Sequence, residues 1–144
     1  MKPGLAPGHR GTFSRVMTQA DTVPALFPDA THLQGMPGVL ATAKMIGLME
    51  WACVEHLLPY YDEGEVSLGI HVDVNHIAAT PPGMKVTVET EVEEIDGRFI
   101  WFRVRARDEH DVIGEGRHRR AIVAQEKFEA KAAAKAAGLT EEAL

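Results

Sequence analysis

The sequence predicts an α+β fold in which an antiparallel sheet wraps around one long central helix, with a further helix at the carboxyl end. Two hydrophobic periods support this prediction. Apolar residues recur every three or four positions between 38 and 58, as they do along one face of a helix. From residue 66 the period becomes two, the period of a strand, and turn signals separate four such stretches.

The length of 144 residues fits one domain, since a chain of about 150 residues buries roughly 70% of the surface that its unfolded form exposes. We expect a single domain over 1–144. Residues 1–37, with five prolines and four glycines, form an arm that contains a first strand near 12–18. Residues 125–144 form a terminal helix and a tail, and the helix is rich in residues of high helix propensity.

The composition excludes several classes of function. The single cysteine, Cys53, rules out an internal disulfide framework, and no cysteine or histidine pair has the spacing of a metal site. No segment approaches the roughly 18 apolar residues that span a bilayer, so we expect a cytoplasmic protein with no membrane partner. The net charge of -6 argues against general nucleic-acid binding, which depends on neutralising phosphates.

The long predicted helix carries a glutamate in its apolar face. Glu50 lies four residues after Ile46 and three before Cys53, so it belongs to that face. The other sides of the helix are also largely apolar, which predicts a helix enclosed on most of its surface. A lone glutamate in such a place usually packs along its stem and keeps the carboxylate in solvent, because an unpaired buried carboxylate is costly.

The first long strand, near 66–78, has its apolar residues at even-numbered positions, and His76 shares their face. Three more strands are expected at 85–95, 98–108 and 112–124. Asp96-Gly97 is a strong hairpin signal between the first two of them. The apolar phase changes before that turn, which predicts a bulge near Glu93-Glu94.

Charged side chains follow the predicted strands in two clusters. Once the bulge is allowed for, glutamates and arginines share the outer face of two strands, and we interpret them as a solvated ladder of unlike charges: Glu89, Glu91, Arg103, Arg105 and Arg107. The cluster GRHRR alternates faces, so His118 and Arg120 point one way while Arg117 and Arg119 point the other. Either ordinary edge solvation or a phosphate-binding patch would explain this cluster.

Three polar residues on the faces expected to pack together suggest a reactive site. Thr42 borders the face of Glu50 two turns earlier on the helix, and His76 lies on the facing strand. Each has an ordinary structural explanation when taken alone. Together they supply a carboxylate that can act as nucleophile or base, an imidazole that transfers protons and a hydroxyl that orients either group. This combination suits acyl transfer.

Three stretches of the chain resemble a known family. MIGLMEWACVEHLLPY, EGEVSLGIHVDVNHIAATPPG and IGEGRHRRAIVAQEKF are similar to the fluoroacetyl-CoA thioesterase group of the hot-dog fold thioesterases, over about residues 4–131. The resemblance implies a homodimer with two sites at the subunit interface. It also implies hydrolysis of an acyl-CoA to the free acid and CoA, with no metal or redox cofactor and with CoA present only as part of the substrate.

The resemblance also implies roles for individual residues. Thr42, Glu50 and His76 match the catalytic positions: Glu50 attacks the thioester or activates water, His76 moves the proton, and Thr42 hydrogen-bonds the carboxylate. Gly69 and Arg120 match positions that line the acyl end of the pocket.

One feature of the family is absent from this chain. The resemblance implies a lid over the acyl group, built from two phenylalanines, whereas the matching positions here are Leu33 and Met36. Flexible aliphatic side chains still exclude water, but we do not expect them to discriminate one fluorine atom. The sequence therefore predicts a thioesterase for a small acyl-CoA, either short-chain or of a substituted acetyl type.

Two alternatives use the same fold. One is a non-hydrolytic module that binds an acyl-CoA or acyl-carrier thioester without cleaving it. The other is a hydratase or dehydratase acting on an enoyl or 3-hydroxyacyl thioester, which is disfavoured because the motif residues match the thioesterase pattern.

Overall fold

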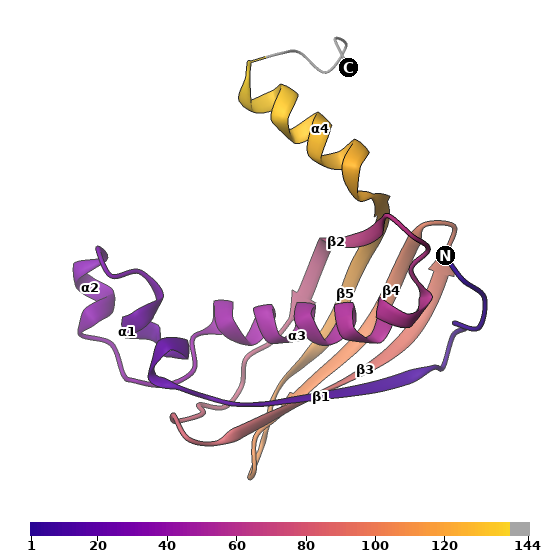
Figure 1. The fold of residues 1–144 in the computed structure, drawn as a ribbon. Coiled ribbons are helices and arrows are strands. Elements are labelled where there is room, and N and C mark those ends of the chain that lie inside the picture. The colour runs from indigo at the N-terminus through magenta and orange to yellow at the C-terminus, as the bar shows by residue number, and fades with distance from the viewer. Residues whose placement is uncertain (139–144) are drawn as a thin grey trace.

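The computed structural model describes residues 1–138 and shows a five-stranded antiparallel sheet with one long helix lying across a single face (Figure 1). The strands are β1 (Arg10–Val16), β2 (Glu65–Val74), β3 (Lys85–Asp96), β4 (Phe99–Arg107) and β5 (Val112–Ala124). The helices are α1 (Val23–Leu26), α2 (Thr31–Gln34), α3 (Thr42–Leu57) and α4 (Gln125–Ala136), with single 3-10 turns at Gln19–Asp21 and Leu58–Tyr60. The predicted fold class is confirmed; the tail expected beyond the last helix, 139–144, lies outside the described residues.

The order of strands across the sheet is β1-β3-β4-β5-β2, so β1 and β2 form its two edges. The central helix separates β1 from β2 in the chain, and the sheet curves around that helix (Figure 1). The helices α1 and α2 lie beyond the amino-terminal end of α3, and α4 leaves the end of β5 and projects from the body. No helix within residues 1–138 is long and apolar enough to cross a membrane.

The core lies between α3 and the sheet, where the predicted helix face is buried. Met45, Met49 and Cys53 are at most 1% exposed, and they belong to one cluster with Ile100 and Phe102 from β4. Burying side chains of this size contributes roughly 1.5–3 kcal/mol each, which is enough to hold α3 against the sheet.

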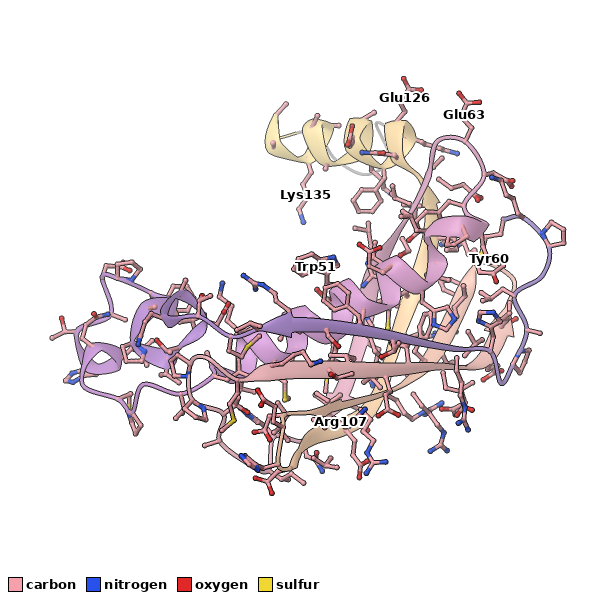
Figure 2. All side chains as sticks on the ribbon, turned by 60° about the horizontal axis from the view of Figure 1, so that its bottom comes forward. Trp51, Tyr60, Glu63, Arg107, Glu126 and Lys135 are labelled. Carbon is pink, nitrogen blue, oxygen red and sulfur yellow. The ribbon has the colours of Figure 1, made fainter. Side chains whose placement is uncertain are left out.

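The prediction that α3 is enclosed on most sides was wrong for one side of the helix. Trp51 is 44% exposed and packs against the edge strand β1, with its ring centroid 4.7 Å from that of Phe13. Figure 2 shows Trp51 and Arg107 on opposite sides of the molecule, with α3 and the sheet between them. The sheet covers one face of the helix, and residues 1–138 supply no second layer over the side of Trp51.

The bulge in β3 and its charged outer face agree with the prediction. The register of β3 against β4 shifts between Val92 and Glu94. On the outer face, Arg107 Nε donates to Glu89 at 2.8 Å and Arg10 Nε donates to Glu91 at 3.1 Å. Exposed pairs of this kind contribute about 0–1 kcal/mol each, so the ladder keeps this face soluble more than it stabilises the fold.

The prediction for β2 was right for its second half and wrong for its first. A bulge between Gly69 and His71 reverses the parity of the strand. Before the bulge, Gly69 faces α3, and Ser67 is buried on the same side. After the bulge, Val72 pairs with the buried His118. Strand periodicity cannot reveal such an extra residue, because Leu68, Ile70 and Val72 continue one unbroken apolar alternation through the bulge.

β2 also ends earlier than the expected strand, which ran to about residue 78. β2 stops at Val74, so His76 lies just beyond it. Two backbone hydrogen bonds to β5 nevertheless continue past the strand, from the N–H of Asn75 to Glu115 and from the N–H of Ile77 to Ile113. His76 is thus held at a fixed place beside the sheet.

His56, near the carboxyl end of α3, is buried and does not serve as a solvated cation. Its Nδ1 lies 2.7 Å from Thr90 Oγ1, and its Nε2 lies 2.7 Å from Nδ1 of His9 in the N-terminal arm. Tyr60 OH lies 3.2 Å from the other nitrogen of His9. Burial lowers the pKa of His56, and the neighbouring His9 acts in the same direction. The folded protein therefore favours neutral His56.

This lowered pKa predicts an acid-sensitive fold. The unfolded chain binds a proton at His56 near the ordinary pKa of 6.5, whereas the folded chain resists it. The contribution of His56 is complete above pH 6.5 and decreases as the pH falls below it. Urea unfolding should therefore give a lower midpoint at pH 5.5 than at pH 7.5. His56→Gln should show a smaller difference between the two pH values, whereas the exposed His32→Gln should match wild type; equal pH sensitivity in all three proteins contradicts the assignment.

Candidate active site

The central feature of the site is the close approach of Glu50 to Gly69. Glu50 lies midway along α3, and Gly69 lies on β2 directly opposite. A methyl group added to Gly69 would lie 2.5 Å from Oε1 of Glu50 and 2.9 Å from Cε1 of His118. Only glycine fits such contacts, so the absence of a side chain at position 69 lets the carboxylate reach the sheet.

A buried arginine lies beside this carboxylate. Arg120, on β5, is 5% exposed, and its Nη1 lies 3.5 Å from the same added methyl position that Glu50 approaches. Its Nε donates to Ser67 Oγ at 2.8 Å, and its Nη2 donates to the Ser67 carbonyl at 2.8 Å. Ser67 Oγ also lies 2.6 Å from Tyr61 OH. Several hydrogen bonds therefore fix the plane of the guanidinium.

His118 completes this group of buried side chains. It is 1% exposed, its Nδ1 donates to the carbonyl of His71 at 2.9 Å, and its Nε2 lies 3.0 Å from Nη1 of Arg120. A carbonyl and a guanidinium fix the ring as a neutral imidazole, because the first can only accept and the second can only donate. Burial lowers the pKa of His118, and the Arg120 charge adds to that effect.

Thr42 and His76 form a second pair. Thr42 is the first residue of α3, and its Oγ1 lies 2.8 Å from Nδ1 of His76. The other ring nitrogen, Nε2, is buried and has no hydrogen-bond partner among residues 1–138. Burial lowers the pKa of His76, which favours the neutral ring. This nitrogen is able to exchange a proton with a substrate or water.

Within a single chain the structure brings Thr42 and His76 together, whereas Glu50 belongs to the other cluster. Thr42 and Glu50 are eight residues apart on α3, which places them about 12 Å apart along the helix axis. The chain thus holds two clusters: Glu50 with Gly69, His118 and Arg120, and Thr42 with His76. Shared helix faces indicate direction around the axis but not proximity along it.

The two residues at the lid positions lie outside both clusters. Leu33 is half-buried on α2, and Met36, 47% exposed, follows that helix. The N–H of Met36 donates to the Leu33 carbonyl at 3.1 Å, so one tight turn holds them together. They lie beyond the amino-terminal end of α3, on the side where Thr42 begins the helix (Figure 1).

Cys53 lies in the wall of the site and is chemically quiet. It is fully buried one turn after Glu50 on α3, and burial raises the pKa of its thiol to about 12. A thiol that stays protonated is a poor nucleophile. The carboxylate of Glu50 is the more suitable nucleophile or base in this cluster.

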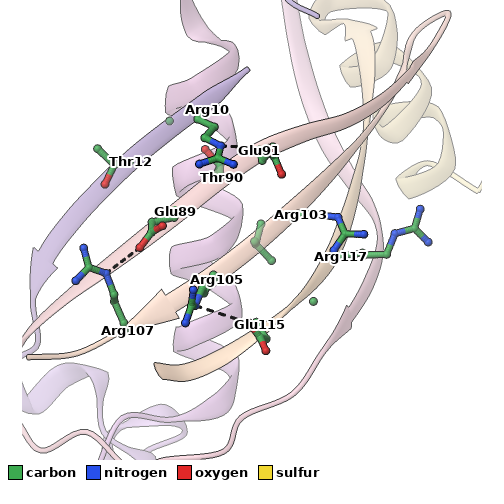
Figure 3. A pocket seen from close by; sticks show the side chains of 13 residues that line it. Arg10, Thr12, Glu89, Thr90, Glu91, Arg103, Arg105, Arg107, Glu115 and Arg117 are labelled. Atoms are coloured by element: carbon green, nitrogen blue, oxygen red, sulfur yellow. Dashed lines mark hydrogen bonds and ion pairs between the residues drawn. The ribbon is translucent and has the colours of Figure 1, made fainter. Parts of the chain in front are cut away.

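A cavity of about 850 Å³ on the outer face of the sheet does not coincide with either cluster. Figure 3 shows it over β3, β4 and β5, with α3 behind the sheet. Its walls are the charged ladder, where Arg107 pairs with Glu89 and Arg105 lies near Glu115. Because these charges are already paired and the cavity is open, it offers a ligand no concentrated charge.

Comparison with known proteins identifies the family of this chain. The family model for the fluoroacetyl-CoA-specific thioesterase matches residues 22–126. The chain belongs to that family. A fluoroacetyl-CoA thioesterase from Streptantibioticus cattleyicolor is 47% identical over 131 residues, which are 91% of this chain and 94% of that protein.

Solved structures agree with this assignment. The fluoroacetyl-CoA thioesterase FlK superposes with a TM-score of 0.91 at 45% identity, over 92% of this chain and 98% of that chain. A thioesterase superfamily member from Thermus thermophilus gives a TM-score of 0.80 at 35% identity, over 90% and 91% of the two chains. The chain is therefore a thioester hydrolase with the hot-dog fold, as its sequence predicted.

The structure adds two polar residues to the site that the sequence analysis did not select. His118 was placed in a cluster that either edge solvation or a phosphate-binding patch would explain, and Ser67 occupies an odd-numbered position, on the face opposite to the predicted apolar one. Both are buried against Arg120. Strand alternation in GRHRR places His118 on the same face as Arg120, and this pattern could have indicated that His118 belongs to the site. The bulge in β2 hid the orientation of Ser67.

The close approach at position 69 predicts the effect of one methyl group. Gly69→Ala should displace the Glu50 carboxylate and lower kcat/KM at least tenfold, while the protein still folds, because φ at Gly69 is not positive. Gly47→Ala, three residues before Glu50 on α3, is the matched control, since no atom lies within 4 Å of its added methyl. Thioester hydrolysis and thermal unfolding of both variants test this; full activity of Gly69→Ala contradicts it.

Proposed function

We propose that this thioesterase hydrolyses a small acyl-CoA, of short-chain or substituted acetyl type, to the free acid and CoA. The observation that carries the proposal is the Glu50 carboxylate held over Gly69 beside the buried Arg120. A carboxylate in a water-poor wall is a competent base or nucleophile toward a thioester carbonyl. An arginine N–H beside it stabilises negative charge that develops on the acyl group.

The residues have complementary tasks in this reaction. Glu50 either attacks the carbonyl carbon, giving an acyl anhydride that water then opens, or removes a proton from the attacking water. In both routes the C–S bond breaks, and the CoA sulfur leaves as a thiol after protonation. His76, with its unpartnered Nε2, is the group proposed to move that proton, and Thr42 orients its ring through the 2.8 Å contact.

The small size of the proposed acyl group follows from the packing around Glu50. The space above Gly69 is bounded by Glu50, the His118 ring and Arg120, all within 3.5 Å of a single added methyl. Small acyl groups also occur with similar proteins: variants of FlK are in complex with acetyl-CoA and with fluoroacetate and CoA. A long acyl chain would have to displace buried side chains of the cluster.

The acyl selectivity is proposed to be broader than fluoroacetyl. Leu33 and Met36 stand at the lid positions, and neither offers an aromatic ring to the acyl group. Flexible aliphatic side chains exclude water without fixing the position of one fluorine atom. Apolar contacts alone discriminate small substituents by roughly 10–200-fold, so the lid positions set an upper limit on selectivity.

A panel of acyl-CoAs with detection of released thiol tests this proposal. We expect turnover of acetyl-, fluoroacetyl- and propionyl-CoA, with kcat/KM for the first two within about tenfold of each other, and little turnover of a long-chain acyl-CoA. Glu50→Gln and His76→Ala should each lower kcat by about 100-fold or more. Glu55→Gln, on the exposed side of the same helix, should match wild type.

Each outcome of the acyl-CoA panel favours or contradicts a different hypothesis. Recovery of intact thioester after tight binding would favour the non-hydrolytic alternative, and loss of enoyl-CoA absorbance would favour a hydratase. A preference of several hundredfold for the fluorinated substrate would contradict the inference from the lid positions. Unchanged turnover in Glu50→Gln would contradict the assigned role of the carboxylate.

We propose further that the active enzyme is a homodimer joined through β2. β2 is an edge strand, and its apolar side chains Ile70 and Val72 are 47% and 41% exposed. Natural proteins seldom leave a long apolar edge open, because it pairs with another strand. A second subunit across this edge would lie beside both clusters, since Gly69 is on β2 and His76 follows it.

Substitution on the two edges of the sheet tests the dimer. Wild type should sediment at about twice the chain mass of 15.8 kDa. Val72→Asp places a charge on the proposed interface, so it should sediment as a monomer and lose activity. Val16→Asp is the matched control, because Val16 is 53% exposed on the opposite edge strand. A monomeric wild type that hydrolyses its substrate would contradict this proposal.

A further inference from the structure

The buried hydrogen bonds of Arg120 leave few of its donors for a substrate. A guanidinium has five N–H groups. One of these, on Nε, bonds Ser67 Oγ, and one on Nη2 bonds the Ser67 carbonyl. One on Nη1 bonds His118 Nε2 at 3.0 Å. Since Nη1 is also the nitrogen beside the space above Gly69, its second N–H is the donor best placed to enter the site.

His118 is the partner of that nitrogen. The guanidinium is a rigid planar fork, so Ser67 at Nε and Nη2 and His118 at Nη1 set its direction together, and among the bonds described within residues 1–138 only the one to His118 is made by Nη1 itself. The histidine is in turn locked by its Nδ1 bond to the backbone of His71, which fixes both the ring plane and the tautomer. Its Nε2 lone pair therefore points at Arg120 in every turnover.

We propose that His118 is a positioning residue for thioester hydrolysis: as a neutral imidazole it accepts a hydrogen bond from Arg120 and thereby aims the second Nη1 N–H at the acyl group beside Glu50. The inference rests on the proposed hydrolysis at Glu50. The ring edge also forms part of the wall of the acyl space, since Cε1 lies 2.9 Å from a methyl group added to Gly69. A side chain at position 118 that accepts no hydrogen bond would leave a buried N–H of Nη1 unpaired and would remove one of the bonds that orient the guanidinium.

A double-mutant cycle with Arg120 distinguishes positioning from a general effect on folding. His118→Leu should lower kcat/KM for acetyl-CoA at least tenfold in the wild-type background. In an Arg120→Met background the same change should cost less than twofold, because the group on which His118 acts is gone. Equal losses in the two backgrounds would show a merely structural role and overturn the proposal.

The conservative variant supplies a second readout. The amide oxygen of His118→Gln can accept from Nη1 near the place of Nε2, so this variant should recover most of the activity that His118→Leu loses, at a similar melting temperature. Failure of glutamine to restore activity in a folded protein would count against the hydrogen bond as the active feature. His110→Gln, an exposed histidine in the loop after β4, is the control and should behave as wild type.

An experiment on the wild-type dimer or monomer covers the case in which the leucine variant does not fold. Nitrogen-15 spectra of labelled histidine should show His118 as a neutral ring protonated at Nδ1 at neutral pH. A proton on Nε2 would overturn the proposal directly, because that nitrogen could not accept from Arg120. Since this measurement needs no substrate, it separates failure of the positioning role from failure of the proposed reaction, which the acyl-CoA panel reports.

Discussion

The contact between the Glu50 carboxylate and the backbone of Gly69 is the constraint on which the rest of the site depends. It exists because α3 packs closely on the sheet through Met45, Met49 and Cys53, and because position 69 has no side chain. Glu50 is partly buried at this place. The neighbouring buried guanidinium of Arg120 compensates electrostatically, and its own hydrogen bonds prevent it from collapsing onto the carboxylate as a simple ion pair.

The protein thus uses polar groups in two different ways. On the outer face of the sheet, charges pair at the surface and keep it soluble. On the inner face, each polar group is locked by a partner from another strand: Arg120 by Ser67, and His118 by the backbone of His71. Such networks cost more to assemble than an apolar core, and they define one geometry. That rigidity suits a site that must hold a small acyl group near one carboxylate.

The second cluster, Thr42 with His76, forms an incomplete site within a single chain. Its hydroxyl and imidazole are hydrogen-bonded to each other, yet His76 retains a buried ring nitrogen without a partner among the described residues. The cluster lies about two turns of α3 from Glu50. Both clusters adjoin β2 or the segment after it, and the exposed apolar side chains of that edge give a physical reason for a second subunit to complete the site.

Hydrophobic period and turn chemistry in the sequence were enough to determine the sheet, the central helix, the bulge in β3 and the inward direction of Glu50, and they placed His118 and Arg120 on one shared face. These features follow from local backbone geometry, which repeats at fixed intervals along the chain. Tertiary structure alone decided the rest. The bulge in β2 turned Gly69 and Ser67 toward Arg120, and packing neutralised His56 and His118. Distance along α3 separated Thr42 from Glu50. Periodicity specifies which way a side chain points, whereas the groups that it meets depend on how distant segments pack.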